Sequence, residues 1–368
     1  MTSTSQHASE TAAASRAAEP KHVNHITRSF TELASTVRET GLLARSYTFY
    51  GVYSAVLVLA LGGVIAGIVL LGDSWFQLLM AFALAVVFTQ FAFMGHEASH
   101  RAIFVSGPAN DRLGRFLSTV VVGISYQWWM NKHSRHHANP NQMGKDPDIA
   151  SDTIMFVEED ASRSKGLVRA IVKRQGWIFF PILTLEGINL HYRSVASLVQ
   201  QGSRRQKWTE IPAIALHFGL YLVPLFLFLP LGMAFAFLGV QMAVFGVYMG
   251  ASFAPNHKGM MIVPEGTKMD FLSKQVLTSR NIRGGWPMSI LMGGLNFQIE
   301  HHLFPNMARP HLIRTREIVR EECATLGLPY TETSLMESYG IVIRYLNKVG
   351  LAARDPFDCP ERVAMGRG

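Results

Sequence analysis

The sequence predicts an all-α integral membrane protein, in which four membrane-spanning helices form two hairpins accompanied by interfacial helices and a cytosolic helical cap. Three observations lead to this fold class. Of the 368 residues, 49% are hydrophobic and 16% are charged, whereas about a quarter of the residues in soluble domains carry a charge. The mean hydropathy is +0.17. Four uncharged apolar runs are each about long enough to cross a bilayer, which argues against an ordinary soluble enzyme.

The chain divides into a cytosolic N-terminal segment, residues 1–45, and a membrane domain, residues 46–368. Residues 1–20 are rich in Ala, Ser and Thr and contain no apolar block, so we expect them to be disordered and not to act as a signal peptide. The net charge is +8. On so apolar a chain, this charge favours contact with anionic lipid headgroups over binding to nucleic acid.

The first predicted hairpin has spans at about 53–71 and 75–94, and the joint between them is too short for anything but an antiparallel turn. The second hairpin has spans at about 211–229 and 231–254, with Pro230 marking the turn. Each run has the length that a helix needs to cross a hydrocarbon core of roughly 30 Å. The pattern therefore predicts two transmembrane hairpins.

The distribution of basic residues predicts the orientation. Lys and Arg are absent from residues 46–100 and 208–257, so the positive-inside rule places both termini and the long middle segment in the cytosol. Two shorter apolar stretches, Phe116–Trp129 and Trp177–Leu190, have about 14 residues each, too few to span, and are expected to lie along the interface. The cytosolic cap then collects all the polar clusters on one side of the membrane.

Three short clusters each place two or three metal-binding side chains on one face of a helix. They use i, i+3 and i, i+4 spacings, which put side chains about one turn apart. The clusters are His96 and His100, then His133, His136 and His137, then Gln298, His301 and His302, and a further histidine, His257, follows the fourth span.

With four spans, these eight histidines and Gln298 lie at one depth on the cytosolic side, where we expect a metal site. One metal ion takes about four to six ligands, so this set suits two ions. Neutral imidazole suits iron, zinc, copper or nickel, and the ligand type leaves the metal open. The two cysteines, Cys323 and Cys359, have no C-x-x-C spacing and predict no thiolate site.

The remaining six histidines are interpreted separately. His191 is expected to be structural. His217 lies inside a predicted span, where an ionisable side chain is a functional candidate, although a hydrogen bond to a neighbouring helix explains it as well. Four others lie in the N-terminal tail or in a basic stretch and are expected to be solvated: His7, His22, His25 and His311.

Two other classes of protein compete with an oxidative metalloenzyme. His96-Glu97-Ala98-Ser99-His100 also fits the H-E-x-x-H pattern of zinc metalloproteases, in which the Glu is the general base. That interpretation leaves the second and third clusters without a role. A metal transporter would need ionisable groups in the middle of several spans, and only His217 meets that condition.

The clusters resemble the three histidine boxes of the membrane fatty acid desaturases. The third, Asn296-Phe297-Gln298-Ile299-Glu300-His301-His302-Leu303-Phe304-Pro305, is similar to the Q-x-x-H-H box of front-end and bacterial acyl-lipid desaturases. The similarity runs from about residue 46 to about residue 312. It implies O2-dependent introduction of a cis double bond into a long-chain fatty acyl group, carried on CoA, on a carrier protein or in a lipid. We expect the protein in a bacterial plasma membrane. Lipid or carotenoid hydroxylases and ketolases share this metal chemistry and remain an alternative.

The resemblance also implies a non-haem di-iron centre. By position, its iron ligands are His96, His100, His133, His136, His137, His257, His301 and His302, with Gln298 as a candidate ninth ligand. Carboxylates typically orient ligating imidazoles through the other ring nitrogen, and the candidates are Glu97, Asp146, Asp148 and Glu300. The candidate residues of the substrate path are Trp128, Trp129, Trp286 and Asn296.

The reaction needs two electrons, and the sequence has no H-P-G-G haem motif, cysteine cluster or G-x-G-x-x-G fingerprint to accept them from a reductant. We therefore expect a separate ferredoxin-like or similar carrier with an NAD(P)H reductase. Basic residues on the cytosolic side are candidates for its docking surface: Arg163, Lys165, Arg169, Lys173, Arg174, Arg204, Arg205, Lys207, Arg309, Arg314, Arg316 and Arg320.

Overall fold

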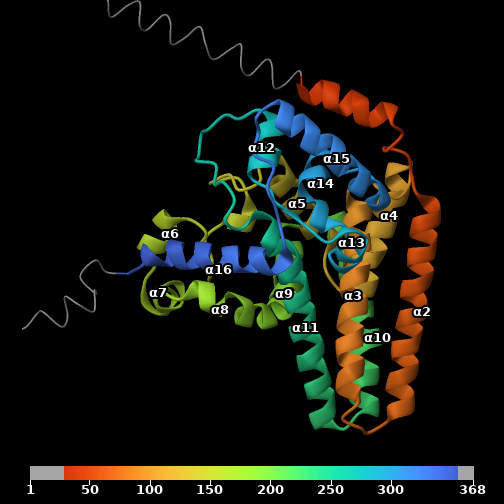
Figure 1. The fold of residues 1–368 in the computed structure, drawn as a ribbon. Helices are drawn as coiled ribbons and strands as arrows, with labels where there is room; N and C mark the ends of the chain where they lie inside the picture. Colours follow the sequence, from red (N-terminus) through yellow and green to blue (C-terminus); the bar gives the residue numbers. More distant parts are fainter. Residues whose placement is uncertain (1–28, 355–368) are drawn as a thin grey trace, which may run out of the picture.

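The computed structural model describes residues 29–354, and four long helices dominate it (Figure 1). Each is long and apolar enough to cross a membrane, and they are α2 (Tyr47–Leu71), α3 (Gln77–Ser99), α10 (Arg204–Phe228) and α11 (Leu231–His257). Short turns join α2 to α3 and α10 to α11, so the predicted pair of hairpins is confirmed. The N-terminal tail with His7, His22 and His25, and also Cys359, lie outside the described residues.

The long helices extend beyond the predicted spans at the ends that carry polar residues. The second span was expected to end near residue 94, but α3 continues to Ser99 and includes His96. His257 was expected just past the fourth span, but it is the last residue of α11. A hydropathy window stops where polar residues begin, whereas the backbone hydrogen bonds of a helix continue through them. His96 and His257 therefore lie on the ends of long, rigid helices.

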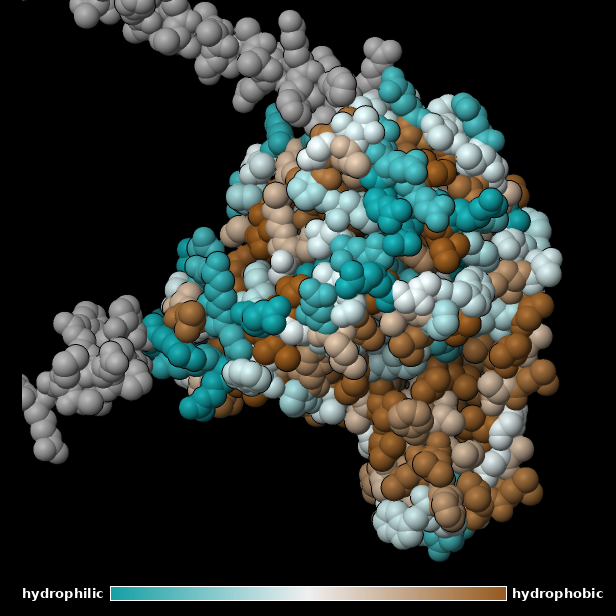
Figure 2. Space-filling model, in the orientation of Figure 1, coloured by the Kyte–Doolittle hydropathy of each residue, from teal (hydrophilic) through white to brown (hydrophobic). Residues whose placement is uncertain are grey.

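The exposed surface of the long helices is apolar. The most apolar windows of α2 and α10 are only 11% and 17% buried, against 61% for α3. Leu70 and Phe228, near the far ends of α2 and α10, are 84% and 81% exposed. Figure 2 shows this part of the molecule as a continuous hydrophobic surface below a more hydrophilic cap. Such a surface is stable in contact with lipid hydrocarbon, and the chain is therefore a membrane protein.

Short helices connect the two hairpins. In chain order they are α4 (Gly107–Phe116), the π-helix η1 (Leu117–Val122), α5 (Tyr126–Ala138), η2 (Pro147–Ile149), α6 (Glu158–Arg163), α7 (Gly166–Val172), α8 (Gln175–Ile182), η3 (Leu183–Leu185) and α9 (Glu186–Gln201). Both short apolar stretches belong to this region, and neither forms a continuous helix. The stretch 116–129 is divided among α4, η1 and α5, and the stretch 177–190 among α8, η3 and α9.

The segment after α11 completes the cap. It contains α12 (Phe271–Leu277), β1 (Asn281–Ile282), α13 (Gly285–Leu291), η4 (Leu295–Phe297), α14 (Gln298–Leu303), α15 (Arg309–Thr325), β2 (Glu332–Thr333) and α16 (Leu335–Leu351). The two strands pair in parallel, with Asn281 opposite Glu332 and Ile282 opposite Thr333. In Figure 1, α5, α12, α14 and α15 gather at one end of the four long helices.

A pair of glycines sets the close packing of α9 against α11. A Cβ atom on Gly187 would lie 2.2 Å from the Met242 carbonyl oxygen, and one on Gly246 would lie 2.4 Å from the Gly187 nitrogen. These approaches involve backbone atoms that cannot move aside. The contact holds the helix that ends at His257 against the connector region.

Candidate metal centre

The fold brings the eight predicted histidines together in two neighbouring groups. The first group contains His96, His100, His133, His137 and His301, and the second contains His136, His257 and His302. Within each group, one ring nitrogen from every member lies within 4.8 Å of the others. Four parts of the chain that are far apart in sequence supply them: the end of α3, then α5, the end of α11, and α14.

The first group centres on the Nε2 atom of His133. It lies 2.9 Å from Nε2 of His96 and 2.7 Å from Nε2 of His100. The indole ring of Trp129, one turn earlier on α5, stacks on the His133 ring with the centroids 4.6 Å apart. Ser125 caps the N-terminus of α5 by accepting from the Trp128 amide. It also donates to the buried carboxylate of Glu210 on α10, which fixes the position of the helix that carries this cluster.

The second group has its ring orientations fixed by hydrogen bonds at Nδ1. His136 faces the Asp146 carboxylate at 3.0 Å, His257 faces the Thr278 carbonyl oxygen at 2.9 Å, and His302 faces Oε1 of Gln275 at 2.9 Å. Each acceptor holds the proton on Nδ1 and leaves the lone pair of Nε2 free to bind a metal.

The arrangement fits metal ions. Buried ring nitrogens normally have hydrogen-bond partners, but both nitrogens of His137 and the Nε2 atoms of His301 and His302 have none among the described residues. Nitrogen ligands bound at about 2.0–2.1 Å from one metal lie roughly 3 Å apart, which is close to the spacings around His133. The donor set, all imidazole nitrogen at its centre, is suited to transition metals.

Electrostatics keep most of these imidazoles neutral. Burial, with a further contribution from His136, lowers the pKa of His100 to about 3. Burial also lowers the pKa of His133, His137, His301 and His302 well below the ordinary value. Metal binding requires the neutral form of imidazole, so proton competition is weak here.

His136 is the exception among these imidazoles. Burial opposes its protonation, but the carboxylates of Asp146 and Asp148 outweigh burial and raise its pKa. Asp148 also pairs with Lys132. Burial alone would raise the pKa of Asp148. The positive charge of Lys132, and after it that of His136, outweighs burial and lowers this pKa. Of the four predicted orienting carboxylates, Asp146 and Asp148 are therefore placed against a clustered imidazole.

Glu97 and Glu300 make other contacts. Glu97 accepts two hydrogen bonds from Arg309 and one from Tyr50. Glu300 accepts from Asn281 and Tyr330. Both carboxylates are thus bound by side chains outside the two histidine groups. Burial raises the pKa of Glu300 to about 7, against the effect of its two hydrogen bonds.

Sequence reasoning missed Gln275 and Thr278 as partners of His302 and His257. Both residues belong to α12 or its C-cap and lie more than twenty positions from the histidines they hold. No spacing pattern of the kind that revealed the clusters connects such distant positions.

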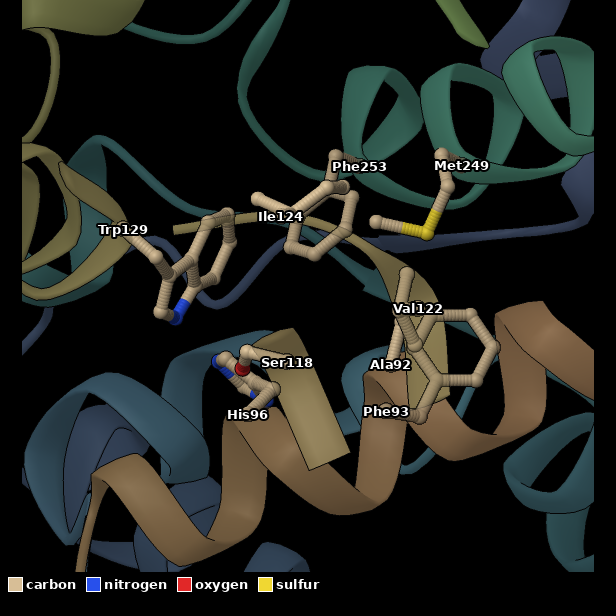
Figure 3. A pocket seen from close by; sticks show the side chains of 9 residues that line it. All are labelled: Ala92, Phe93, His96, Ser118, Val122, Ile124, Trp129, Met249 and Phe253. Carbon is tan, nitrogen blue, oxygen red and sulfur yellow. The ribbon is translucent and has the colours of Figure 1, made fainter. Parts of the chain in front are cut away.

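A small apolar cavity adjoins the first group (Figure 3). His96 and Trp129 lie at one end of the group of side chains that line it, and Phe93, Val122 and Met249 lie toward the other. Of the other predicted path residues, Trp128 packs against the main hydrophobic core and Trp286 is 41% exposed and contacts Phe49. Asn296 is fully buried, and its side-chain amide has no hydrogen-bond partner among the described residues.

Three histidines lie outside the two groups within the described part of the chain. His191 and His217 contact carbonyl oxygens of the π-helix, Val122 and Val120 respectively. A π-helix leaves carbonyls without their usual intrahelical partners, and these imidazoles satisfy them, which gives both residues a structural role. His311 was expected to be solvated but is half-buried.

The basic docking candidates do not all lie on the surface. Arg309 is only 2% exposed and pairs with Glu97. Arg316 is mostly shielded and pairs with Glu332. The buried ion pair with Glu97 removes Arg309 from any docking surface. Arg163, Lys165, Arg174, Arg204, Arg205, Arg314 and Arg320 are exposed, and Arg169, Lys173 and Lys207 are partly exposed.

Fold and site together define a helical membrane protein with a histidine-rich metal centre. A family model described as fatty acid desaturase matches residues 73–334, which is most of the chain and includes all three histidine clusters. The chain belongs to the fatty acid desaturase family and is an oxidoreductase that desaturates fatty acyl groups.

Individual relatives agree with this family. The chain is 29% identical to Delta(8)-fatty-acid desaturase 2 of Arabidopsis thaliana, over 91% of this chain and 77% of that protein. It is 27% identical to Delta(6)-fatty-acid desaturase fat-3 of Caenorhabditis elegans, over 87% of this chain and 74% of the relative. It is 28% identical to an acyl-lipid (9-3)-desaturase of Borago officinalis, over 72% of this chain and 62% of that protein.

Proposed function

We propose that the two histidine groups bind two iron ions and that this di-iron centre desaturates a long acyl chain, whose reacting methylene groups approach the first group at the adjoining apolar cavity. The observation that carries the proposal is the meeting of eight imidazoles in two groups beside that cavity. Five nitrogens of the first group would hold one ion. His136, His257 and His302 would hold the other, and all eight are the proposed ligands.

Bound iron would supply the oxidising power that O2 needs to remove hydrogen from an unactivated methylene group. The protein's own residues orient the ligands and exclude water. Asp146, Thr278 and Gln275 hold three imidazoles through Nδ1. The apolar side chains of Phe93, Val122 and Met249, together with Trp129, surround the space next to His96, where a methylene group can approach the first group.

Among the predicted path residues, Trp129 has the strongest support because it lines the cavity and stacks on His133. Asn296 is a second candidate because its buried amide is free to bind a polar group of the substrate. The contacts of Trp128 and Trp286 are with core and surface residues, and we assign them to packing.

We infer the position of the double bond from the relatives. Their names specify Delta(8) and Delta(6) products, and this numbering counts from the carboxyl carbon. We therefore propose that this chain also desaturates the carboxyl half of its substrate, whether the acyl group is carried on CoA or on a lipid.

The electrons would come from a separate carrier protein with an NAD(P)H reductase, on the cytosolic side. The orientation rests on the absence of Lys and Arg from residues 46–100 and 208–257, which include both hairpin tips. The bacterial plasma membrane, expected from the third histidine cluster, remains a prediction.

The contacts of Glu97 argue against a zinc protease, in which this residue would be the general base. Both carboxylate oxygens of Glu97 are engaged by Arg309 in a buried ion pair, so this side chain is not free to activate water. A lipid hydroxylase or ketolase differs from a desaturase in its product. Product analysis therefore distinguishes these chemistries.

The test is the fatty acid profile of a host that expresses the chain. We expect a new unsaturated fatty acid, whose double-bond position is read by mass spectrometry after derivatisation. His301→Ala should abolish this product and lower the bound iron, whereas His311→Asn, a matched change outside both groups, should alter neither. An active His301→Ala enzyme, or a hydroxylated or keto product, would refute the proposal.

A further inference from the structure

Gln298 is a non-histidine side chain whose amide lies beside Nε2 of His257 in the second histidine group. It is the first residue of α14 and is only 2% exposed. Its Nε2 atom lies 2.9 Å from Nε2 of His257, and its Oε1 atom lies 3.1 Å from Nδ2 of Asn256. Whether Gln298 binds a metal depends on which end of the amide faces the group, because only the oxygen is a ligand.

The backbone of α11 decides this orientation through Asn256. The Nδ2 atom of Asn256 lies 3.2 Å from the carbonyl oxygen of Ser252, one turn earlier. A carbonyl oxygen can only accept, so the NH2 group of Asn256 must face it. The other N–H of the same group points at Gln298. The oxygen of Gln298 therefore faces Asn256, and its NH2 group faces His257.

The reverse orientation is unfavourable at every step. Rotating the Gln298 amide by half a turn would place its NH2 group against the NH2 group of Asn256, so that two hydrogen-bond donors would face each other in a buried site. Turning Asn256 over as well would set its oxygen against the Ser252 carbonyl oxygen. Each mismatch leaves buried polar atoms unsatisfied, which costs more than an ordinary hydrogen bond contributes.

The three imidazoles of the group present lone pairs to the same space. The protons of His136, His257 and His302 are held on Nδ1 by Asp146, Thr278 and Gln275, as described above. Their Nε2 atoms therefore carry the lone pairs, and Nε2 of His136 lies 3.3 Å from Nε2 of His257. The group thus combines three nitrogen ligands with one N–H donor.

We propose that Gln298 is a hydrogen-bond donor into the second metal site and not a ligand of the metal. An amide N–H cannot bind a cation, but it can donate to a small anion or other lone-pair-bearing molecule that binds there. Gln298 would then select what enters the second site, and Asn256 would be the positioning residue that keeps its NH2 group turned inward.

The test separates metal binding from anion binding in the full-length protein, purified in detergent. Co2+ is the metal probe and azide is the anion probe, both followed by absorption spectroscopy. Gln298→Met keeps the length of the side chain and removes the donor. We expect it to bind as many Co2+ ions as the wild type with unchanged affinity, but to bind azide about tenfold or more weakly, as for loss of a hydrogen bond to a charged group.

Gln275→Leu is the matched control, because Gln275 is also a buried glutamine but accepts from His302. Loss of this orienting bond should weaken Co2+ binding by about 10- to 100-fold. His257→Ala should remove one Co2+ ion. Gln298→Leu repeats the test if Gln298→Met is unstable, as judged by size-exclusion chromatography.

A Gln298→Met protein that loses a Co2+ ion would show that Gln298 is a ligand and would overturn the proposal. Unchanged azide affinity would also overturn it. The inference rests on the two-metal site proposed above, and the two can fail separately. A wild-type protein that binds no Co2+ at the histidines contradicts the proposed function, whereas a normal wild type with either of the Gln298 results above contradicts only this inference.

Discussion

Arg309 and Glu97 form an ion pair in the interior of the protein, although they lie 212 positions apart. Nε of Arg309 donates to Oε1 of Glu97 at 2.9 Å, and Nη2 donates to Oε2 at 2.5 Å. The hydroxyl of Tyr50 donates to the same carboxylate, and the guanidinium lies over the ring of Tyr53. The pair joins α15 to α2 and to the end of α3 that carries the first histidine cluster.

Breaking this pair from one side should destabilise the protein strongly. Arg309→Met leaves the Glu97 carboxylate buried without its partner, and such a change typically costs about 3–5 kcal/mol. We expect a lower melting temperature in detergent and a loss of bound metal, since the end of α3 loses its anchor. Differential scanning fluorimetry and metal analysis measure the two effects.

The double variant Arg309→Met with Glu97→Gln is the control. It removes both charges, so part of the lost stability should return. A double variant no more stable than Arg309→Met alone would show that packing of the arginine side chain matters more than the charge.

Asp146 should control the affinity of the second metal site. It accepts from His136 at Nδ1 and also from the backbone amides of Asn141 and Asp148. Asp146→Asn keeps the shape but removes the negative charge that supports the ligand. Metal affinity should fall by about 10- to 100-fold at one of two sites, as measured by metal content after dialysis against a chelator. Asp152→Asn, at an exposed surface pair with Arg193, should leave metal content unchanged.

Gly123, which follows the π-helix, should not tolerate a side chain. Its φ is +85°, and a Cβ atom would lie 2.4 Å from Cδ2 of His217. Gly123→Ala therefore adds a steric clash to a backbone cost of roughly 1–2 kcal/mol, and the melting temperature should fall. Gly219→Ala, in α10 where a Cβ meets open space, should be neutral or slightly stabilising. The double variant Gly123→Ala with His217→Ala should lose less stability than the sum of the losses in the two single variants, because the clash with the imidazole disappears. Additive losses of stability would contradict this explanation.

The parts of this structure that follow from local periodicity could be predicted from the sequence. The apolar runs gave four spans, and the spacing of His133, His136 and His137 placed them on one face of a helix. The same local geometry could not show that Glu97, beside His96, is bound by Arg309 and Tyr50.

Contacts between distant segments could not be predicted in this way. Arg309 looked like one more basic residue of a cytosolic surface, because its partner Glu97 is brought to it only by the packing of α15 on the long helices. Gln275 and Thr278 reach their imidazoles from α12 in the same manner. The ends of α3 and α11 were missed because hydropathy falls before the helix ends.

The proposed orientation can be tested by labelling single cysteines. In a background with Cys323→Ser and Cys359→Ser, we expect Asp73→Cys and Leu231→Cys, at the two hairpin tips, to react with a membrane-impermeant maleimide added to intact cells. Ala150→Cys, in the connector between the hairpins, should react only after the cells are opened. Labelling of Ala150→Cys from outside would invert the topology and contradict the cytosolic placement of the metal site.

The last prediction concerns the electron carrier. Purified protein with NADPH, O2 and acyl substrate should form no product, and addition of a reductase and a small acidic carrier should restore turnover. Its rate should fall as salt is raised, since attraction between opposite charges on exposed surfaces is screened. Sustained turnover without a carrier would reveal an electron-accepting site within this chain.

We propose that this carrier docks on the basic surface of α15. Arg314 and Arg320 are exposed on α15, which packs against the helix that carries His301 and His302. Arg163 and Lys165 are exposed at the end of α6, which packs against α16. Charge reversal of the α15 pair to Glu should therefore slow carrier-dependent turnover and flatten its salt dependence, because electrons must reach the adjacent histidines. The same reversal at Arg163 and Lys165 should have a smaller effect, and equal effects of the two pairs would indicate contact with anionic lipid in place of a defined carrier site.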